Sequence, residues 1–457
     1  MPAWKILICL VGAAVSGMVS LVSAGPYTDS AHGNRISGVD RSSIDAKYSA
    51  FAKGNCSHCH ELHSSLGGIE PEPSGSVGNR SLRFAAEEDL CNTCHDGNPV
   101  APNIQIEFNK LYSHPVTSYR DRHTLGIAEK GQGGQPFRGI KRHVECSDCH
   151  EPHTVQGQTH SAPGNAVSGV LLGSWGVEPN TESLWQPPIS STEVAPATKE
   201  YQICFKCHSY YALQDLDGVT SLLGPSGVPI TDQAMEFSKA NRSVHPVRVA
   251  LNAQTGSYSP NALGNSKMKA PWNLSSGNQT MYCSDCHGNN TATPVGPHGS
   301  NNPFMLEGNW SWPFKPGGGK LWTLADVKNN QNSWNTRLLC AKCHTMIVNN
   351  NFNNQPHNKS DHISGGYNAA PYSNYDTSLA CVACHTPVPH GSSASRLIGY
   401  DTLPEPYKVT VATGATFPVI RQFKKASSAT NYNKQSCFVP TQAACHAVHD
   451  KAVEGAD

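Results

Sequence analysis

The hydrophobic pattern of the chain predicts short elements separated by long stretches of coil. An apolar face with acidic residues leads from Ser81 into the segment EEDLCNTCH and predicts a helix, and TDQAMEFSKA begins a second short helix at Thr231. The runs YKVTV and TFPVIRQF flank Thr413-Gly414 and predict a β-hairpin, which Pro418 weakens because proline lacks an amide donor. Glycine, proline, asparagine and serine dominate elsewhere, so we expect mostly coil with short helices and few strands.

The composition leaves little material for a core made of side chains. The 457 residues include 40 glycines and 32 prolines, and charged residues make up 15 % of the chain, against about 25 % in ordinary domains. Such a chain forms many turns and little long regular structure. We therefore expect something other than packed side chains to organise the interior.

The first 24 residues have the pattern of a secretory signal peptide. Lys5 precedes a long apolar stretch rich in small residues, and Val22-Ser23-Ala24 matches a cleavage signature. A membrane anchor is the alternative, because the apolar run is close to spanning length, but glycines and serines dilute it. We expect residues 1–24 to be removed and residues 25–457 to be exported without a membrane anchor.

Sixteen cysteines remain when Cys9 leaves with the signal, and an oxidising compartment does not keep that many thiols free. Fourteen of them form seven C-x-x-C-H motifs, the attachment sequence of c-type haem, in which two thiols bond the porphyrin and the histidine ligates the iron. Zinc sites and redox disulfides also use C-x-x-C, but neither explains a histidine after every second cysteine. The motif residues are Cys56, Cys59 and His60; Cys91, Cys94 and His95; Cys146, Cys149 and His150; Cys204, Cys207 and His208; Cys283, Cys286 and His287; Cys340, Cys343 and His344; and Cys381, Cys384 and His385.

The last two cysteines stand in the segment CFVPTQAACH. Cys437 and Cys445 are separated by seven residues, and His446 follows the second cysteine, as in an attachment motif with an enlarged loop. A disulfide that closes this loop is the alternative. We expect an eighth haem c here, in addition to the seven that the regular motifs predict.

Two blocks of sequence repeat along the chain. EFNKLYSHPV at residues 107–116 and EFSKANRSVHPV at residues 236–247 each lie between two attachment motifs, and a further histidine follows the second motif in each case. A shorter third copy runs from Cys340 to His390. We therefore expect one haem-organised chain, residues 25–457, that consists of a leading one-haem segment (25–90), three two-haem modules (91–160, 201–300 and 336–392), a haem-free loop (161–200) and a C-terminal segment with the enlarged motif (393–457).

The chain has 22 histidines, enough to give each of eight irons two imidazole ligands. Without a methionine ligand, such irons are expected to have low reduction potentials. Histidines that recur at matching places in the repeats are the candidates for the sixth ligand: His63, His114, His153, His245, His298, His362 and His390. His357 competes with His362, and the eighth iron draws on His449, His143, His123 or His357.

His63 stands only three residues after His60, which already ligates one face of its haem. So short a tether does not reach around the porphyrin, so His63 is expected to serve a different iron. The same reasoning applies to His153 after His150. A peptide that ligates two haems holds them close together, and we expect a continuous row of seven or eight haems.

The formal net charge is zero, but haem propionates would make the holoprotein acidic. Nucleic acid is therefore excluded as a partner.

The segments CSHCHELHSSLGG, CSDCHEPH and CHTPVPHG and the HPV elements resemble the outer-surface multihaem c-type cytochromes of metal-reducing bacteria, including those that polymerise into nanowires. The resemblance implies a multihaem cytochrome c fold and a secreted protein at the cell exterior or surface; the periplasm is the alternative. It also implies a head-to-tail contact with further copies of the chain, in which His63 ligates a haem of the neighbouring subunit.

We expect extracellular electron transfer, with other cytochromes or external acceptors as partners. A soluble monomeric carrier is the alternative. An octahaem oxidoreductase that acts on nitrogen or sulfur oxyanions is a third hypothesis, which needs an iron with an open position. The sequence has no unusual proximal ligand and enough histidines for full ligation, so we predict no catalytic residue and no enzyme.

Overall fold

The computed structural model describes part of the chain, and the following concerns that part. The described residues are 27–60, 82–84, 86–97, 101–116, 130–131, 135–136, 143–180, 182–213, 222–223, 229–254, 262–317, 319–328, 334–345, 378–423 and 437–438. The predicted signal segment 1–24 lies outside these ranges.

The helices of the described part are one or two turns long, as expected for a chain rich in glycine and proline. The α-helices are α1 (Glu87–Asn92), α2 (Gln105–Phe108), α3 (Cys146–Cys149), α4 (Glu200–Cys204), α5 (Tyr210–Leu213), α6 (Gln233–Glu236), α7 (Leu324–Lys328), α8 (Trp334–Arg337) and α9 (Cys340–Cys343). The 3-10 helices are η1 (Tyr27–Asp29), η2 (Ala46–Tyr48), η3 (Cys56–His58), η4 (Gly169–Leu171), η5 (Leu251–Ala253), η6 (Asn265–Lys267), η7 (Cys283–Asp285), η8 (Pro303–Met305), η9 (Cys381–Ala383) and η10 (Ser395–Leu397). No helix in these ranges has the length and apolar character needed to cross a membrane.

The strands form two-stranded antiparallel sheets. The local hairpins are β2 (Lys130–Gly131) with β3 (Gln135–Pro136), β4 (Gly176–Pro179) with β5 (Ser191–Val194), β6 (Leu222–Leu223) with β7 (Pro229–Ile230), β11 (Val409–Thr410) with β12 (Thr416–Phe417), and β13 (Gln422–Phe423) with β14 (Cys437–Phe438). The long-range pairs are β1 (Tyr112–Ser113) with β9 (Gly299–Ser300) and β8 (Ser243–Val244) with β10 (Gly391–Ser392). In both long-range pairs, the strand before an HPV element meets the strand after a Pro-His element, so the sequence repeat is also a structural repeat.

Two of the three predicted elements are confirmed. α6 follows Thr231, and its cap Asp232 accepts from the amide of Met235. The β11–β12 hairpin has Gly414 in its turn at φ +84°, a backbone conformation that glycine adopts without strain.

The predicted helix start at Ser81 is wrong, because α1 begins at Glu87. Leu82 instead pairs with His60 in a β-bridge, and the Arg83 side chain donates to the carbonyl of Ser57. These contacts hold the segment before α1 in an extended form against the first motif.

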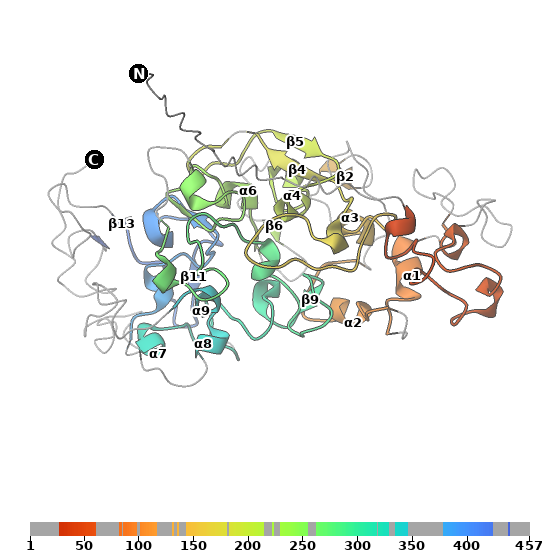
Figure 1. Ribbon diagram of the computed structural model, residues 1–457. Helices are drawn as coiled ribbons and strands as arrows, with labels where there is room; N and C mark the ends of the chain where they lie inside the picture. The colour runs from red at the N-terminus through yellow and green to blue at the C-terminus, as the bar shows by residue number, and fades with distance from the viewer. Residues whose placement is uncertain are drawn as a thin grey trace, which may run out of the picture.

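Chain order follows the long axis of the molecule (Figure 1): α1 lies toward one end, α3 and α4 lie in the middle, and α7 to α9 lie toward the other end. Three apolar clusters occur along this axis. They centre on Phe205, Phe417 and Ile420, and side chains of the motif cysteines pack against each cluster. The side-chain core is thus divided into parts that border the attachment motifs.

Candidate haem-binding sites

All seven regular motifs have the same local geometry. In each, the amide of the histidine donates to the carbonyl of the first cysteine at 2.8–3.0 Å, so the five residues close one turn. This turn brings the two cysteines and the histidine of each motif close together. The seven sites are numbered along the chain by their motif histidines, as site 1 (His60), site 2 (His95), site 3 (His150), site 4 (His208), site 5 (His287), site 6 (His344) and site 7 (His385).

Neighbouring thiols show that the sites follow one another in chain order. Hydrogen bonds join the thiols of Cys91 and Cys146 and those of Cys204 and Cys283, which raises the pKa of Cys146 and of Cys204. Electrostatic contacts of the thiols connect the remaining neighbours, which are Cys59 with Cys94, Cys149 with Cys204, Cys286 with Cys343, and Cys381 with Cys340. Each site from 1 to 6 therefore lies next to the site that follows it in the sequence.

In each of the first two modules, a hydrogen bond between a glutamate and a serine fixes the position of one motif relative to the other. Glu87 in α1 accepts from the amide of Ser147 at 2.6 Å, and Glu200 in α4 accepts from the amide of Ser284 at 2.9 Å. Each glutamate stands four residues before the first cysteine of one motif, and each serine follows the first cysteine of the next. The third module has Thr336 and Val382 at these positions, so the glutamate–serine pair is not repeated there.

Six motif histidines each face one further histidine from a distant part of the chain. The ring centroids are 5.8–6.5 Å apart, with interplanar angles of 14° to 70°. Two imidazoles that bind one metal ion from opposite sides, each through a bond of about 2.0 Å, have centroids about 6 Å apart. The pairs are His60 with His153, His95 with His32, His150 with His298, His208 with His114, His287 with His390, and His344 with His245.

In many of the paired histidines, and in His385 of site 7, the Nδ1 atom lies within hydrogen-bond distance of a backbone carbonyl. Because a carbonyl only accepts, Nδ1 carries the proton and Nε2 is left as the ligand atom. On the motif side, Nδ1 is 3.2 Å from Pro102 O in His95, 2.7 Å from Val170 O in His150, 2.8 Å from Phe304 O in His287, and 3.1 Å from Arg396 O in His385.

A proline carbonyl binds the partner histidine in three successive repeats. His32 donates to Pro152, His114 to Pro297, and His245 to Pro389. Each of these prolines directly precedes His153, His298 or His390, the partner histidine of a neighbouring site. Each Pro-His element therefore supplies one ring and orients another.

Burial lowers the pKa of several of the paired imidazoles and favours their neutral form. It lowers the pKa of His287 and His344 to about 4 and that of His298 to about 3, and it also lowers the pKa of His114 and His245. A neutral imidazole is the form that ligates a metal. At neutral pH these five rings are therefore in the protonation state that a metal ligand needs.

The cysteines do not fit the redox alternative. Burial raises the pKa of Cys59 and Cys340 to about 11 and that of Cys149 and Cys286 to about 12, whereas thiol–disulfide catalysis needs a lowered pKa. The fourteen motif cysteines form no disulfide, and the described residues contain no group of three or more histidine, cysteine or acidic side chains arranged to hold a bare metal ion. Two thiols and a pair of opposed imidazoles fit a covalently attached haem.

His32 is a partner histidine that sequence reasoning missed. It lacks the HPV context of His114 and His245, and only its contact with Pro152 reveals the equivalence. The predicted candidates His114, His153, His245, His298 and His390 all lie in pairs.

Several predicted residues have other positions. His143 was a candidate for the eighth iron, and its Nε2 lies 3.2 Å from the buried carboxylate of Glu145. The predicted residues His63, His123, His357, His362, Cys445, His446 and His449 lie outside the described residues, and Cys437 is described only as part of β14.

Comparisons with known proteins place the chain in no family. No family model, no curated protein and no solved structure matches it.

Proposed function

We propose that the chain is a secreted multihaem c-type cytochrome that carries electrons along a row of haems to extracellular acceptors. The observation that carries the proposal is the set of six opposed histidine pairs, each beside a pair of motif thiols. Haem c, when bound, supplies one-electron chemistry at its iron.

The residues of the chain have three roles in this proposal. The motif thiols bond the porphyrin, the two opposed imidazoles supply both axial ligands, and the carbonyls on Nδ1 fix the ring orientation. Chain segments from distant modules cover the sites, because the partner histidine comes from a different module than the motif. At sites 1 to 6 two imidazoles would occupy both faces of the haem and leave no open position for a substrate, and the proposal does not include catalysis.

The succession of neighbouring thiols supports a single path for electrons. Thiols of sites 1 to 7 neighbour one another in chain order. Electrons entering at one end would therefore pass every site.

The intact mass of the purified holoprotein tests this proposal. We expect eight covalent haems in a chain that begins after residue 24, with a low-spin spectrum for all of them. A mass seven haems above the polypeptide would assign Cys437 and Cys445 to a disulfide. A polypeptide without covalent haem would contradict the proposal.

We further propose that the molecules polymerise head to tail through His63. The histidine that follows site 3, His153, faces site 1; the histidine after site 5, His298, faces site 3; and that after site 7, His390, faces site 5. By this register, His63 after site 1 serves a site two places earlier. None of the seven regular motifs stands at that place, and the segment CSHCHELHSSLGG resembles the polymerising cytochromes, so we assign His63 to a haem of another copy of the chain.

A further inference from the structure

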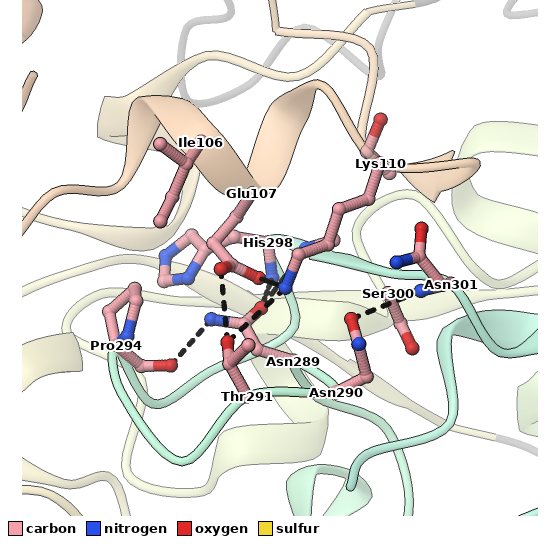
Figure 2. A network of polar contacts seen from close by, with 12 residues as sticks. Ile106, Glu107, Lys110, Asn289, Asn290, Thr291, Pro294, His298, Ser300 and Asn301 are labelled. Atoms are coloured by element: carbon pink, nitrogen blue, oxygen red, sulfur yellow. Dashed lines mark hydrogen bonds and ion pairs between the residues drawn. The ribbon is translucent and has the colours of Figure 1, made fainter. Parts of the chain in front are cut away.

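The two EF-x-K segments hold their buried glutamates in different ways. Glu107 in α2 and Glu236 in α6 are fully buried, and a lysine follows each by three residues. In the first segment, Lys110 Nζ lies 2.5 Å from one oxygen of Glu107, and Thr291 donates to the other oxygen at 3.1 Å (Figure 2). This carboxylate is therefore neutralised by its own lysine.

In the second segment the lysine is engaged elsewhere. Lys239 Nζ lies 3.0 Å from the carboxylate of Glu182. Glu236 instead accepts from Nδ1 of His390 at 2.5 Å, and its other oxygen accepts from the hydroxyl of Tyr407 at 2.7 Å. A buried carboxylate thus contacts a partner histidine of site 5 directly.

The corresponding histidine of site 3 has no such contact. His298 packs against Phe108 as His390 packs against Phe237, with ring centroids 5.9 and 4.7 Å apart. The Nδ1 atom of His298 is buried, and within the described part of the chain it has no hydrogen-bond partner. Asn289 binds the amide of His298 and leaves its ring alone (Figure 2).

We propose that Glu236 lowers the reduction potential of site 5 below that of site 3. This inference rests on the proposed haem binding and deepens it. A carboxylate on Nδ1 makes the imidazole a stronger electron donor and brings a negative charge to the site, and both effects favour Fe(III) over Fe(II). Reduction adds one electron at the iron, and the proton stays between Nδ1 and the carboxylate.

Glu107 lacks this effect on site 3 because Lys110 cancels its charge. Sites 3 and 5 have the same types of ligand, but they differ in reduction potential because Glu107 pairs with a lysine and Glu236 contacts a partner histidine. The haems of the row therefore differ in reduction potential, and the haem at site 5 is harder to reduce than the haem at site 3.

Spectroelectrochemical titration of the whole holoprotein tests the inference. In Glu236→Gln, the side-chain amide still accepts from Nδ1 of His390 but carries no charge. The part of the reduction curve that corresponds to one haem should therefore move to higher potential. The matched control is the double variant Glu107→Gln/Lys110→Met, which removes both charges of the ion pair, leaves the local net charge unchanged and should move the curve much less. Tyr407→Phe removes a competing donor from Glu236 and should move one haem's share to lower potential.

The opposite signs of Glu236→Gln and Tyr407→Phe separate tuning of the potential from simple structural damage, and the second variant keeps the test available if the first does not assemble. Curves that superimpose on that of the wild type, with all haems low-spin, would overturn the inference while leaving the proposed function intact. Equal shifts in Glu236→Gln and in the double variant Glu107→Gln/Lys110→Met would overturn it as well. A wild-type protein without covalent haem would overturn both.

Discussion

At the scale of single residues, ring orientation distinguishes ligand candidates from other histidines. His58 is fully buried inside the first motif, between Cys56 and Cys59, but its Nδ1 accepts from the amide of Arg41 and its Nε2 contacts the carbonyl of Ala52. His160 contacts the carboxylates of Glu200 and Asp285. Both nitrogens of these rings are engaged by the protein, whereas a ligand histidine needs Nε2 free.

Replacing His32 by Ala should remove one axial ligand. We expect one haem to become high-spin at site 2, because His32 faces His95 at 6.5 Å between ring centroids, and the haem content should stay unchanged. Added imidazole should restore the low-spin absorption spectrum.

His160→Gln is the matched control for this experiment, and it should leave the spectrum fully low-spin because His160 faces no motif histidine. A low-spin His32→Ala protein without added imidazole would disprove the assignment of His32 to site 2.

At the scale of elements, buried acidic caps hold the short helices. Asp232 caps α6 through Met235 and also accepts from the amide of Tyr210 at 3.0 Å. Burial raises its pKa from 3.8 to about 7, with a further contribution from the charge of Glu236. The folded protein therefore binds this proton more tightly than the unfolded chain does.

The sign of the pH dependence follows from that difference. The contribution of Asp232 to stability is complete below about pH 4 and is lost as the pH rises through 7. Between pH 5 and pH 8, we expect Asp232→Asn to gain on the order of 1 kcal/mol in free energy of unfolding relative to the wild type. Thermal unfolding of both proteins at pH 5 and at pH 8 gives the difference in free energy of unfolding between the variant and the wild type at each pH. If this difference is the same at the two pH values, Asp232 does not titrate in this range.

At the scale of the whole molecule, the partner histidines interlock sites that are two places apart. Site 1 receives His153, site 3 receives His298 and site 5 receives His390, so each module is bound to the next. The histidines of the other class, His32 and its equivalents, serve sites 2, 4 and 6. Under the proposed haem binding, each interface between modules would contain a metal ligand, so this overlap would resist separation of the modules.

Electron microscopy of His63→Ala tests the proposed continuation of this register between molecules. We expect the wild type to form thin filaments and the variant to remain as discrete particles with the same number of haems. His298→Ala is the matched control, because it removes an internal ligand and should leave the filaments in place. If His63→Ala still forms filaments of normal dimensions, assembly does not need His63 and the proposed link is wrong.

The sequence by itself predicted haem attachment at each site and determined the low content of regular structure. A C-x-x-C-H motif closes within one turn, so five adjacent residues suffice to identify the attachment group, and α6 and the β11–β12 hairpin depend on signals equally local. Repetition of the HPV and Pro-His elements indicated most of the partner histidines as candidates.

Only the tertiary structure decided which histidines face one another, that His32 belongs among them, and which carboxylate contacts a ligand. These contacts join residues far apart in the chain, as in His245 and the carbonyl of Pro389, which are 144 positions apart. Glu107 and Glu236 stand in the same local sequence, EF-x-K, and differ only in what the rest of the fold brings to them. No local pattern encodes that choice, because the competing partners Glu182 and Tyr407 come from other segments of the chain.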